Sequence, residues 1–194
     1  MTAEEQNFIL LLKKGNDEAF RDLVERFSSK MHGLAMSVTR KPQEAEEIVQ
    51  DVFVKVFTTI STFRGESSLS TWIYRLTYNM SIDAVRRSGR RVTDISLDDP
   101  DNGTEITDTE YIPEDVLIRK MRDEDLRQAL MTLPDRDRMI LQMKYVVGMS
   151  YEDICAATGL NEGTLKSGLN RARSRLRKKL QNMWNISEDK TSEQ

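Results

Sequence analysis

Residues 150–177 read SYEDICAATGLNEGTLKSGLNRARSRLR, and this stretch decides the fold of the C-terminal half. Ser150, with Asp153 at the third position after it, is typical of a helix N-terminus, so a short helix is predicted to begin there. The glycine of Gly159-Leu160-Asn161 predicts a tight turn, after which Asn161 can cap a second helix. A short helix, a turn with glycine and a second helix rich in arginine together indicate a helix-turn-helix.

The second of these helices, predicted over residues 162–184, separates apolar and basic side chains onto different faces. Its N-terminus presents backbone donors and the positive end of the helix dipole, which suits a phosphate. A basic amphipathic helix can also be a solvated face or a site for an acidic partner, although the turn before it favours DNA. The apolar face holds Leu165, Leu169, Ala172, Leu176 and Leu180, and the other faces hold Lys166, Asn170, Arg171, Arg173, Arg175 and Arg177.

Charge is segregated along the 194 residues, whose net charge is only −3. Residues 63–91 carry six Arg or Lys against two acids, and residues 161–184 carry seven against one. Between them, residues 92–118 hold nine Asp or Glu and no Arg or Lys. Nine glycines and four prolines favour long helices over strands and turns. We therefore predict an all-α protein: two small helical domains joined by an acidic linker, the C-terminal one containing the helix-turn-helix.

Apolar periodicity predicts four helices before the linker, over residues 17–27, 30–39, 42–60 and 70–87. The third begins with Pro42 and has an apolar stripe that continues for five turns, which includes Phe57. Read from the sequence alone, the residues away from this stripe form a solvated face with one stray valine: Glu47, Gln50, Asp51 and Val54. After the linker, helices are predicted over 114–133 and 134–147, the latter ended by Gly148.

Aromatic and basic residues alternate in the block 63–91. Aromatic faces beside guanidinium groups suit the unstacked bases of a single strand, where each stack is worth about 1–3 kcal/mol. Trp72 and Leu76 at helical spacing could equally belong to the core, whereas Phe63 lies in a polar loop and is expected to be exposed. The block contains Phe63, Trp72, Tyr74 and Tyr78, interleaved with Arg64, Arg75, Arg86 and Arg87, with Asn79 and Asp83 nearby.

Several classes of site are disfavoured. Cys155 is the only cysteine and His32 the only histidine, so no intramolecular disulfide can form and a zinc site is nearly excluded. Paired carboxylates such as Glu46-Glu47 lie on a regular helix, and no Ser/His/Asp set or phosphate loop is present, so we expect neither an enzyme nor a cofactor. The polar N-terminus and the lack of a long apolar run predict a cytoplasmic protein that does not insert into a membrane.

The ordered motifs resemble those of the bacterial sigma-70 superfamily, in its short extracytoplasmic-function type. No single string is decisive, but together they cover nearly the whole chain in the expected order. The strings are residues 43–53 (QEAEEIVQDVF), 63–68 (FRGESS), 70–75 (STWIYR), Asn79 with Ile82-Asp83, Leu133-Pro134, 148–154 (GMSYEDI), 163–167 (GTLKS) and 171–173 (RAR).

The resemblance implies a transcription initiation factor that binds core RNA polymerase and directs it to promoters. It divides the chain into a region 2-like domain (1–91), the linker (92–113), a region 4-like domain (114–185) and a polar tail (186–194). It implies that the third helix docks on the polymerase clamp through Glu47, Gln50, Asp51 and Val54. The implied partners are the clamp and flap of the polymerase, promoter DNA, and an anti-sigma factor that in this family is often tethered to a membrane.

For promoter DNA, the resemblance implies that the Phe63 loop and the helix after it hold the non-template strand of the −10 element. The C-terminal helix would enter the major groove at the −35 element. Relatives often carry Arg or Lys where this chain has Gly168, so we expect a groove-facing side chain to be missing. A glycine in the interior of a helix also lowers the stability of that helix by about 1 kcal/mol relative to alanine. The implied −10 residues are Phe63, Arg64, Ser68, Thr71, Trp72, Arg75, Tyr78, Asn79, Arg86 and Arg87; the −35 residues are Asn161, Gly163, Thr164, Lys166, Ser167, Asn170, Arg171 and Arg175.

The sequence is also compatible in part with two other binding functions. A free-standing helix-turn-helix repressor or activator would explain residues 150–180, but not the Phe63 loop or the third helix. It predicts specific duplex binding without polymerase. A polymerase adaptor would explain the third helix but not the second basic domain.

Overall fold

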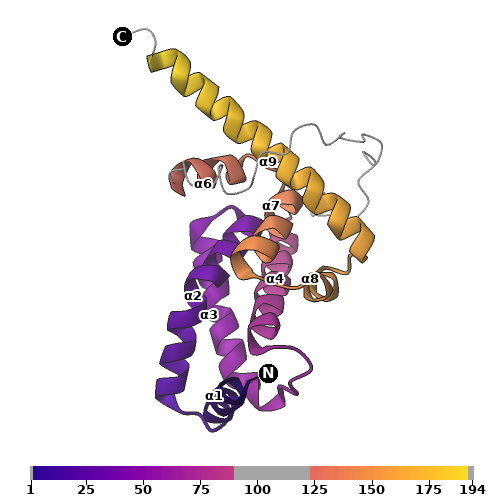
Figure 1. Ribbon diagram of the computed structural model, residues 1–194. Coiled ribbons are helices and arrows are strands. Elements are labelled where there is room, and N and C mark those ends of the chain that lie inside the picture. The colour runs from indigo at the N-terminus through magenta and orange to yellow at the C-terminus, as the bar shows by residue number, and fades with distance from the viewer. Residues whose placement is uncertain (1, 90–122, 192–194) are drawn as a thin grey trace.

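The computed structural model describes residues 2–89 and 123–191, with side chains described over 2–89 and 125–183. Within these ranges every regular element is a helix, which confirms the predicted all-α class (Figure 1). The N-terminal module contains α1 (Ala3–Lys13), α2 (Asp17–Thr39), α3 (Pro42–Thr59), the 3-10 turn η1 (Ile60–Thr62) and α4 (Leu69–Arg87). The C-terminal module contains α6 (Asp123–Met131), α7 (Asp135–Leu141), the π-helical segment η3 (Gln142–Val147), α8 (Tyr151–Thr158) and α9 (Glu162–Thr191).

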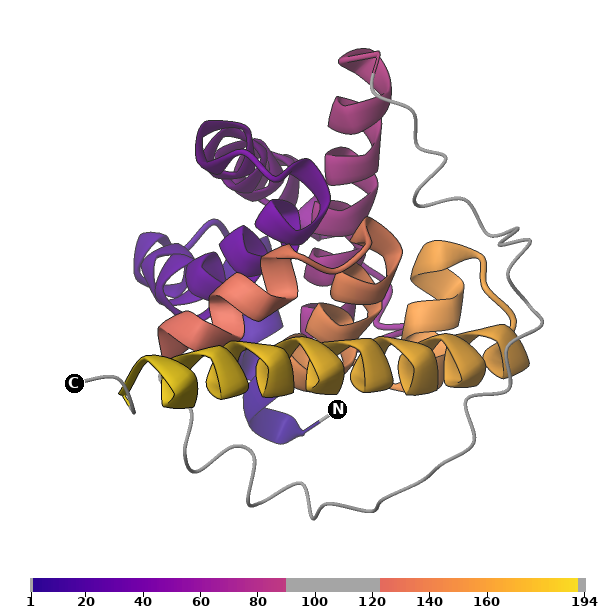
Figure 2. The same ribbon diagram turned by 90° about the horizontal axis from the view of Figure 1, so that it is seen from above.

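The N-terminal module is a bundle of α2, α3 and α4, which pack against one another, with α1 across one end. The C-terminal module packs on the opposite end, and α9 runs over it as one long rod with α6, η3 and α8 on one side (Figure 2). The predicted linker 92–113 and the helix start at 114 lie outside the described residues. No helix in the described part of the chain is long and apolar enough to cross a membrane.

Local capping explains most of the helix starts. Asn16 Oδ1 accepts a hydrogen bond from Ala19 N at 2.8 Å, and Ser68 Oγ accepts one from Thr71 N at 3.1 Å. Pro42 stands at the start of α3, as predicted, where its missing N–H costs nothing.

The N-terminal helices differ from the prediction in two places. The segments 17–27 and 30–39 form one continuous helix, α2. Only two serines separate the segments, and neither is a glycine or proline that would break the helix. The apolar positions Met31, Leu34 and Val38 continue its buried face. Helix α1 was not predicted; Thr2 caps it by accepting a hydrogen bond from Glu5 N at 3.2 Å, and it buries Ile9 and Leu12.

Candidate nucleic-acid interface

The helix-turn-helix has the predicted local geometry. Ser150 Oγ accepts a hydrogen bond from Asp153 N at 3.0 Å and donates one to Asp153 Oδ2 at 2.7 Å, so the two residues cap α8 together. Gly159 ends α8 at a φ of +77°, in the left-handed region that a side chain would strain. Asn161 Oδ1 then accepts from Thr164 N at 2.8 Å and starts α9. The turn is therefore fixed by caps that the sequence shows directly.

Helix α9 buries one face and leaves the other available. Leu165, Leu169, Ala172 and Leu180 are buried, as predicted, while Leu176 is half-buried. Of the candidate −35 residues, Thr164, Arg171 and Arg175 are half-buried, and the exposed ones are Asn161, Gly163, Lys166, Ser167 and Asn170. These exposed residues come from the first turns of α9, the part of a recognition helix that reaches base edges in a major groove.

Lys166 already has an anionic neighbour in the free protein. Its ammonium group lies 2.6 Å from Glu162 Oε1, and this hydrogen bond and charge raise the pKa of Lys166. The same ammonium group lies 5.7 Å from the ring centre of Tyr151, which Lys144 approaches to 4.3 Å from its own position. Both effects favour the charged form of Lys166, and a DNA phosphate would compete with Glu162 for it.

Arg175 has a structural partner inside the module. Its Nη1 donates to Asp137 Oδ2 of α7 at 2.7 Å, and the Asp137 side chain is only 7% exposed. The candidate DNA contact is therefore also the cation that pairs with a buried carboxylate. The sequence offered no signal for this, because 38 residues separate the two side chains.

The expectation that Gly168 removes a groove-facing side chain is wrong. Gly168 is buried, and a Cβ added there would lie 3.2 Å from Ile140 Cδ1 of α7. The glycine therefore lets α9 approach α7 closely, and an arginine here would overpack that contact. Its neighbours Leu165 and Leu169 are buried on the same side of α9, which is the signal in the sequence that assigns Gly168 to the packed face.

The expectation that Phe63 is exposed is also wrong. Its side chain is 7% exposed, with its ring centre 5.2 Å from that of Trp72. Lys13 Nζ of α1 donates a hydrogen bond to the Phe63 carbonyl oxygen at 2.8 Å, which ties the start of the loop to α1. Helix α1, which the sequence did not reveal, thus helps to turn Phe63 inward, and the half-buried Trp72 covers it.

The loop after Phe63 is shaped by its own hydroxyl groups. Ser68 Oγ donates to Thr71 Oγ1 at 2.8 Å, and Thr71 is buried. Glu5 of α1 accepts a hydrogen bond from Leu69 N at 3.2 Å. Arg64 is left with a side chain that is 84% exposed, near Glu66. The candidate residues in this loop therefore divide into those that shape it (Phe63, Ser68, Thr71) and one that projects from it (Arg64).

Helix α4 also divides its candidate residues. Tyr74 and Tyr78 are both buried. Burial raises the pKa of Tyr74 to about 12, and it also raises the pKa of Tyr78. Arg75 is half-buried, and its Nε is enclosed without a hydrogen-bond partner in the described part of the chain. The exposed candidates are Asn79, Arg86 and Arg87, all in the second half of α4. That half presents two guanidinium groups and an amide to solvent, which suits a nucleic-acid backbone.

The outer face of α3 is a surface of mixed character. Glu47, Gln50 and Asp51 are exposed, and Val54 is 63% exposed. Phe57 belongs to the same face with 58% of its surface exposed, although the apolar periodicity had placed it in the buried stripe. Its ring centre lies 4.8 Å from that of Phe20 on α2. Because Val54 and Phe57 are three residues apart, the exposed valine pointed to an apolar patch rather than a stray side chain.

Comparison with known proteins places the two modules in two described regions. Residues 23–91 match the family model of Sigma-70 region 2, and residues 123–176 match that of Sigma-70, region 4. The chain is 30% identical over 179 residues to the ECF RNA polymerase sigma factor SigW of Bacillus subtilis, covering 89% of this chain and 94% of that protein. It is 29% identical over 182 residues to the RNA polymerase sigma-H factor of Pseudomonas aeruginosa, covering 92% of this chain and 94% of that protein.

A solved structure has a similar fold. The sigma factor RpoE of Bartonella quintana, crystallised in complex with the anti-sigma factor NepR, superposes with a TM-score of 0.62 at 28% identity. The superposition covers 84% of this chain and 96% of that one. The similarity therefore extends over both modules.

Proposed function

Since this chain belongs to the sigma-70 family, in its extracytoplasmic-function type, we propose that its two helical modules divide the recognition of a promoter between them. As a member of that family it is a transcription initiation factor that directs RNA polymerase to promoters. The N-terminal module holds the −10 strand through Arg64, Asn79, Arg86 and Arg87, and the helix-turn-helix reads the −35 duplex through the start of α9.

The observation that carries this proposal is the pair of exposed polar faces on two modules that match two different regions of the same family. A free-standing repressor or activator would need only the helix-turn-helix, and a polymerase adaptor would need no second basic module. Neither accounts for the match of residues 23–91 together with that of residues 123–176. The polymerase carries out the chemistry of transcription, and this chain contributes recognition and strand capture only.

The buried positions of Phe63 and Thr71 refine the proposal for the −10 element. The buried ring of Phe63 packs against Trp72, and the hydroxyl group of Thr71 accepts a hydrogen bond from that of Ser68. A captured base would then meet the loop backbone, Arg64 and the exposed part of Trp72 rather than the ring of Phe63. The tilted pair of Phe63 and Trp72 thus contributes by holding the loop in shape before the strand arrives.

The proposed polymerase surface comprises Glu47, Gln50, Asp51, Val54 and Phe57 on α3. It combines carboxylates with an apolar patch, the arrangement of a protein–protein interface with a hydrophobic centre and a polar rim. We also propose that the chain works in the cytoplasm, where it meets polymerase, and that an anti-sigma factor regulates it. The second point rests on the relative that was crystallised with NepR.

Changing Gln50 and Asp51 together to arginine is expected to weaken binding to core RNA polymerase at least tenfold, about 1.4 kcal/mol. Two cations on this face would repel a polymerase surface whose charge complements the carboxylates of α3. Binding is measured by titrating labelled protein with purified core polymerase. Glu152→Arg, an exposed change on α8, is the matched control and should bind normally.

If the Gln50 and Asp51 variant retains full affinity while it is folded, α3 is not the polymerase surface. Circular dichroism of both variants shows whether the helices are intact.

A further inference from the structure

Helix α1 lies outside the part of the chain that matches Sigma-70 region 2, which begins at residue 23. It is nevertheless part of the N-terminal module, because it contacts α2 and η1 and buries Ile9 and Leu12 in the core. Figure 1 shows it at the end of the bundle where the chain passes from η1 into α4. The segment between those two elements is the loop proposed to capture the −10 strand, so α1 lies beside that loop.

One polar side chain of α1 holds the start of the loop. The Lys13 ammonium group donates a hydrogen bond to the Phe63 carbonyl oxygen at 2.8 Å. Phe63 is the residue directly after η1, and its own N–H donates to the Ile60 carbonyl oxygen at 3.1 Å. A hydrogen bond from a charged donor is roughly twice as strong as one between neutral groups. Both backbone polar groups of Phe63 are therefore bonded within the module, which fixes the entry to the loop.

A second polar side chain of α1 holds the end of the loop. Glu5 Oε1 accepts a hydrogen bond from Leu69 N at 3.2 Å. Leu69 is the first residue of α4, where N–H groups lack partners within the helix and the dipole favours an anion. The first turn of α4 contains no acidic residue of its own, so α1 supplies the carboxylate.

Both hydrogen bonds come from one rigid element. Glu5 and Lys13 are eight residues apart on α1, which is about 12 Å along a helix axis. They hold the two ends of a segment whose middle residues are 64–68. Within it, Gly65 has a φ of +75°, in the left-handed region that a glycine adopts without strain. The backbone of the loop is thus constrained at its start, in its middle and at its end.

The order of this loop before binding affects the capture of a strand. Fixing the backbone of a mobile residue opposes binding through lost conformational entropy, and every residue that must be ordered adds to this effect. A loop that is already ordered when the strand arrives avoids it. Arg64 follows directly after the carbonyl group that Lys13 holds, so the same hydrogen bond helps to set where the exposed Arg64 side chain projects.

We propose that Glu5 and Lys13 are positioning residues for capture of the −10 strand: they hold residues 63–69 in the shape that receives an unstacked base. They act through the backbone of the loop rather than by contact with DNA. The ordering of the loop stands on the two hydrogen bonds from α1. Its consequence for strand capture rests on the proposed function.

A direct role of Lys13 in DNA binding has a different signature. If its ammonium group contacted a phosphate of the strand, Lys13→Met would reduce the slope of log K against log salt concentration by about 0.7. A positioning residue leaves the phosphate contacts in place, so we expect weaker binding with an unchanged slope. The measurement titrates the holoenzyme into a promoter fragment with an unpaired −10 segment at several salt concentrations. A reduced slope would contradict the positioning role.

Trp72 reports the state of the loop, because its half-buried ring lies against that of Phe63 with the ring centres 5.2 Å apart. The chain has two tryptophans, so Trp184→Phe leaves Trp72 as the only one. The full-length protein with this change is the parent of all the variants. Quenching of its fluorescence by acrylamide measures how well the loop covers Trp72, with neither promoter nor polymerase present.

The test variant combines Glu5→Met with Lys13→Met, which removes both hydrogen bonds and leaves good helix formers in α1. The matched control combines Glu4→Met with Lys14→Met, the same change in charge and composition at exposed neighbouring positions. We expect the quenching constant of Trp72 to rise about twofold or more in the test variant and to stay at the parent value in the control. If circular dichroism shows that the double variant loses helix, Lys13→Met alone replaces it.

The effect on capture is measured on a promoter that the parent protein selects from a fragment library with purified core polymerase. The test variant should bind core polymerase normally and form about tenfold fewer open complexes, because the strand must then order a mobile loop. Glu5→Gln combined with Lys13→Arg keeps an acceptor and a donor at the same places. This conservative pair should restore both the quenching constant and the open complexes.

Three results would overturn the proposal: quenching of Trp72 that does not rise in the test variant, raised quenching with open complexes at the parent level, or a conservative pair as defective as the test variant. If the parent protein itself initiated at no promoter, the proposed function would be wrong. The quenching of Trp72 would still decide whether α1 orders the loop.

Discussion

Replacing Phe63 with alanine is expected to lower the free energy of unfolding of the N-terminal module by about 3 kcal/mol, at the lower end of what Phe→Ala costs in a core. The side chain is 7% exposed and packs against Trp72, so the change leaves a cavity beneath the loop. Phe63→Leu fills most of that volume and should cost clearly less. Denaturant unfolding of the two variants measures the difference.

The same change should impair promoter opening through the shape of the loop. At a temperature where the Phe63→Ala protein stays folded, we expect at least tenfold fewer open complexes with normal binding to core polymerase. Arg64→Ala separates shape from direct contact, because the Arg64 side chain is 84% exposed and its loss should leave stability unchanged. A Phe63→Ala protein as stable as the parent chain would show that Phe63 does not support the loop.

Replacing Arg175 with alanine is expected to destabilise the C-terminal module by at least about 2 kcal/mol, because a buried hydrogen-bonding group that loses its partner costs about 1–3 kcal/mol, and more when it is charged. Asp137 is 5% exposed and receives a hydrogen bond from Arg175 Nη1 at 2.7 Å. Arg173→Ala is the matched control from the same helix: Arg173 is exposed and donates to Asn170 on its own helix. Thermal or denaturant unfolding should show little effect of that control.

A double-mutant cycle distinguishes the ion pair from a general loss of charge. Asp137→Asn combined with Arg175→Gln should be more stable than the sum of the single changes predicts, since neither partner is then left as an unpaired buried charge. Strictly additive effects would mean that the pair does not couple.

In the folded Arg175→Ala variant, each phosphate contact that is lost should also reduce the slope of log K for DNA binding against log salt concentration by about 0.9.

The sequence predicted those features that depend on neighbouring residues. Ser150 with Asp153, Gly159 and Asn161 defined the helix-turn-helix, and the structure has each of these caps in place. The order of motifs along the chain indicated the sigma-70 family, which the comparisons confirm. Caps and short motifs are local, so their geometry follows from a few adjacent side chains.

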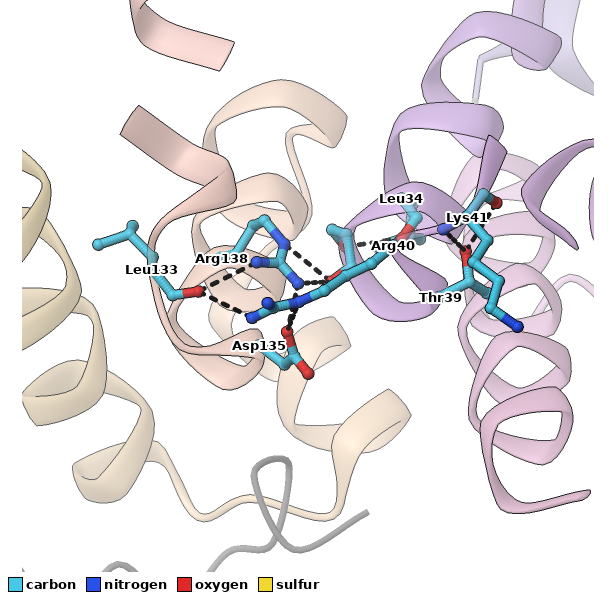
Figure 3. Close-up of polar contacts among 8 residues, drawn as sticks. Leu34, Thr39, Arg40, Lys41, Leu133, Asp135 and Arg138 are labelled. Carbon is cyan, nitrogen blue, oxygen red and sulfur yellow. Dashed lines mark hydrogen bonds and ion pairs between the residues drawn. The ribbon is translucent and has the colours of Figure 1, made fainter. Parts of the chain in front are cut away.

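The features that the sequence did not reveal depend on contacts between distant segments. Phe63 turns inward because Lys13 of α1 holds its carbonyl group and Trp72 covers its ring. Gly168 is needed for the approach of α9 to Ile140 rather than at the DNA surface. Arg138 donates a hydrogen bond to the carbonyl oxygen of Ser37 at the end of α2, 101 residues earlier in the chain (Figure 3). Periodicity tells which face of a helix is apolar, but it does not tell which element will cover that face.

In vitro transcription with purified core polymerase, a library of promoter fragments and this protein tests the central claim most directly. The account predicts that transcripts begin at a distinct set of positions only when the protein is added, and that these start sites share two sequence elements separated by a constant spacing. Start sites that are identical with and without the protein would contradict the account.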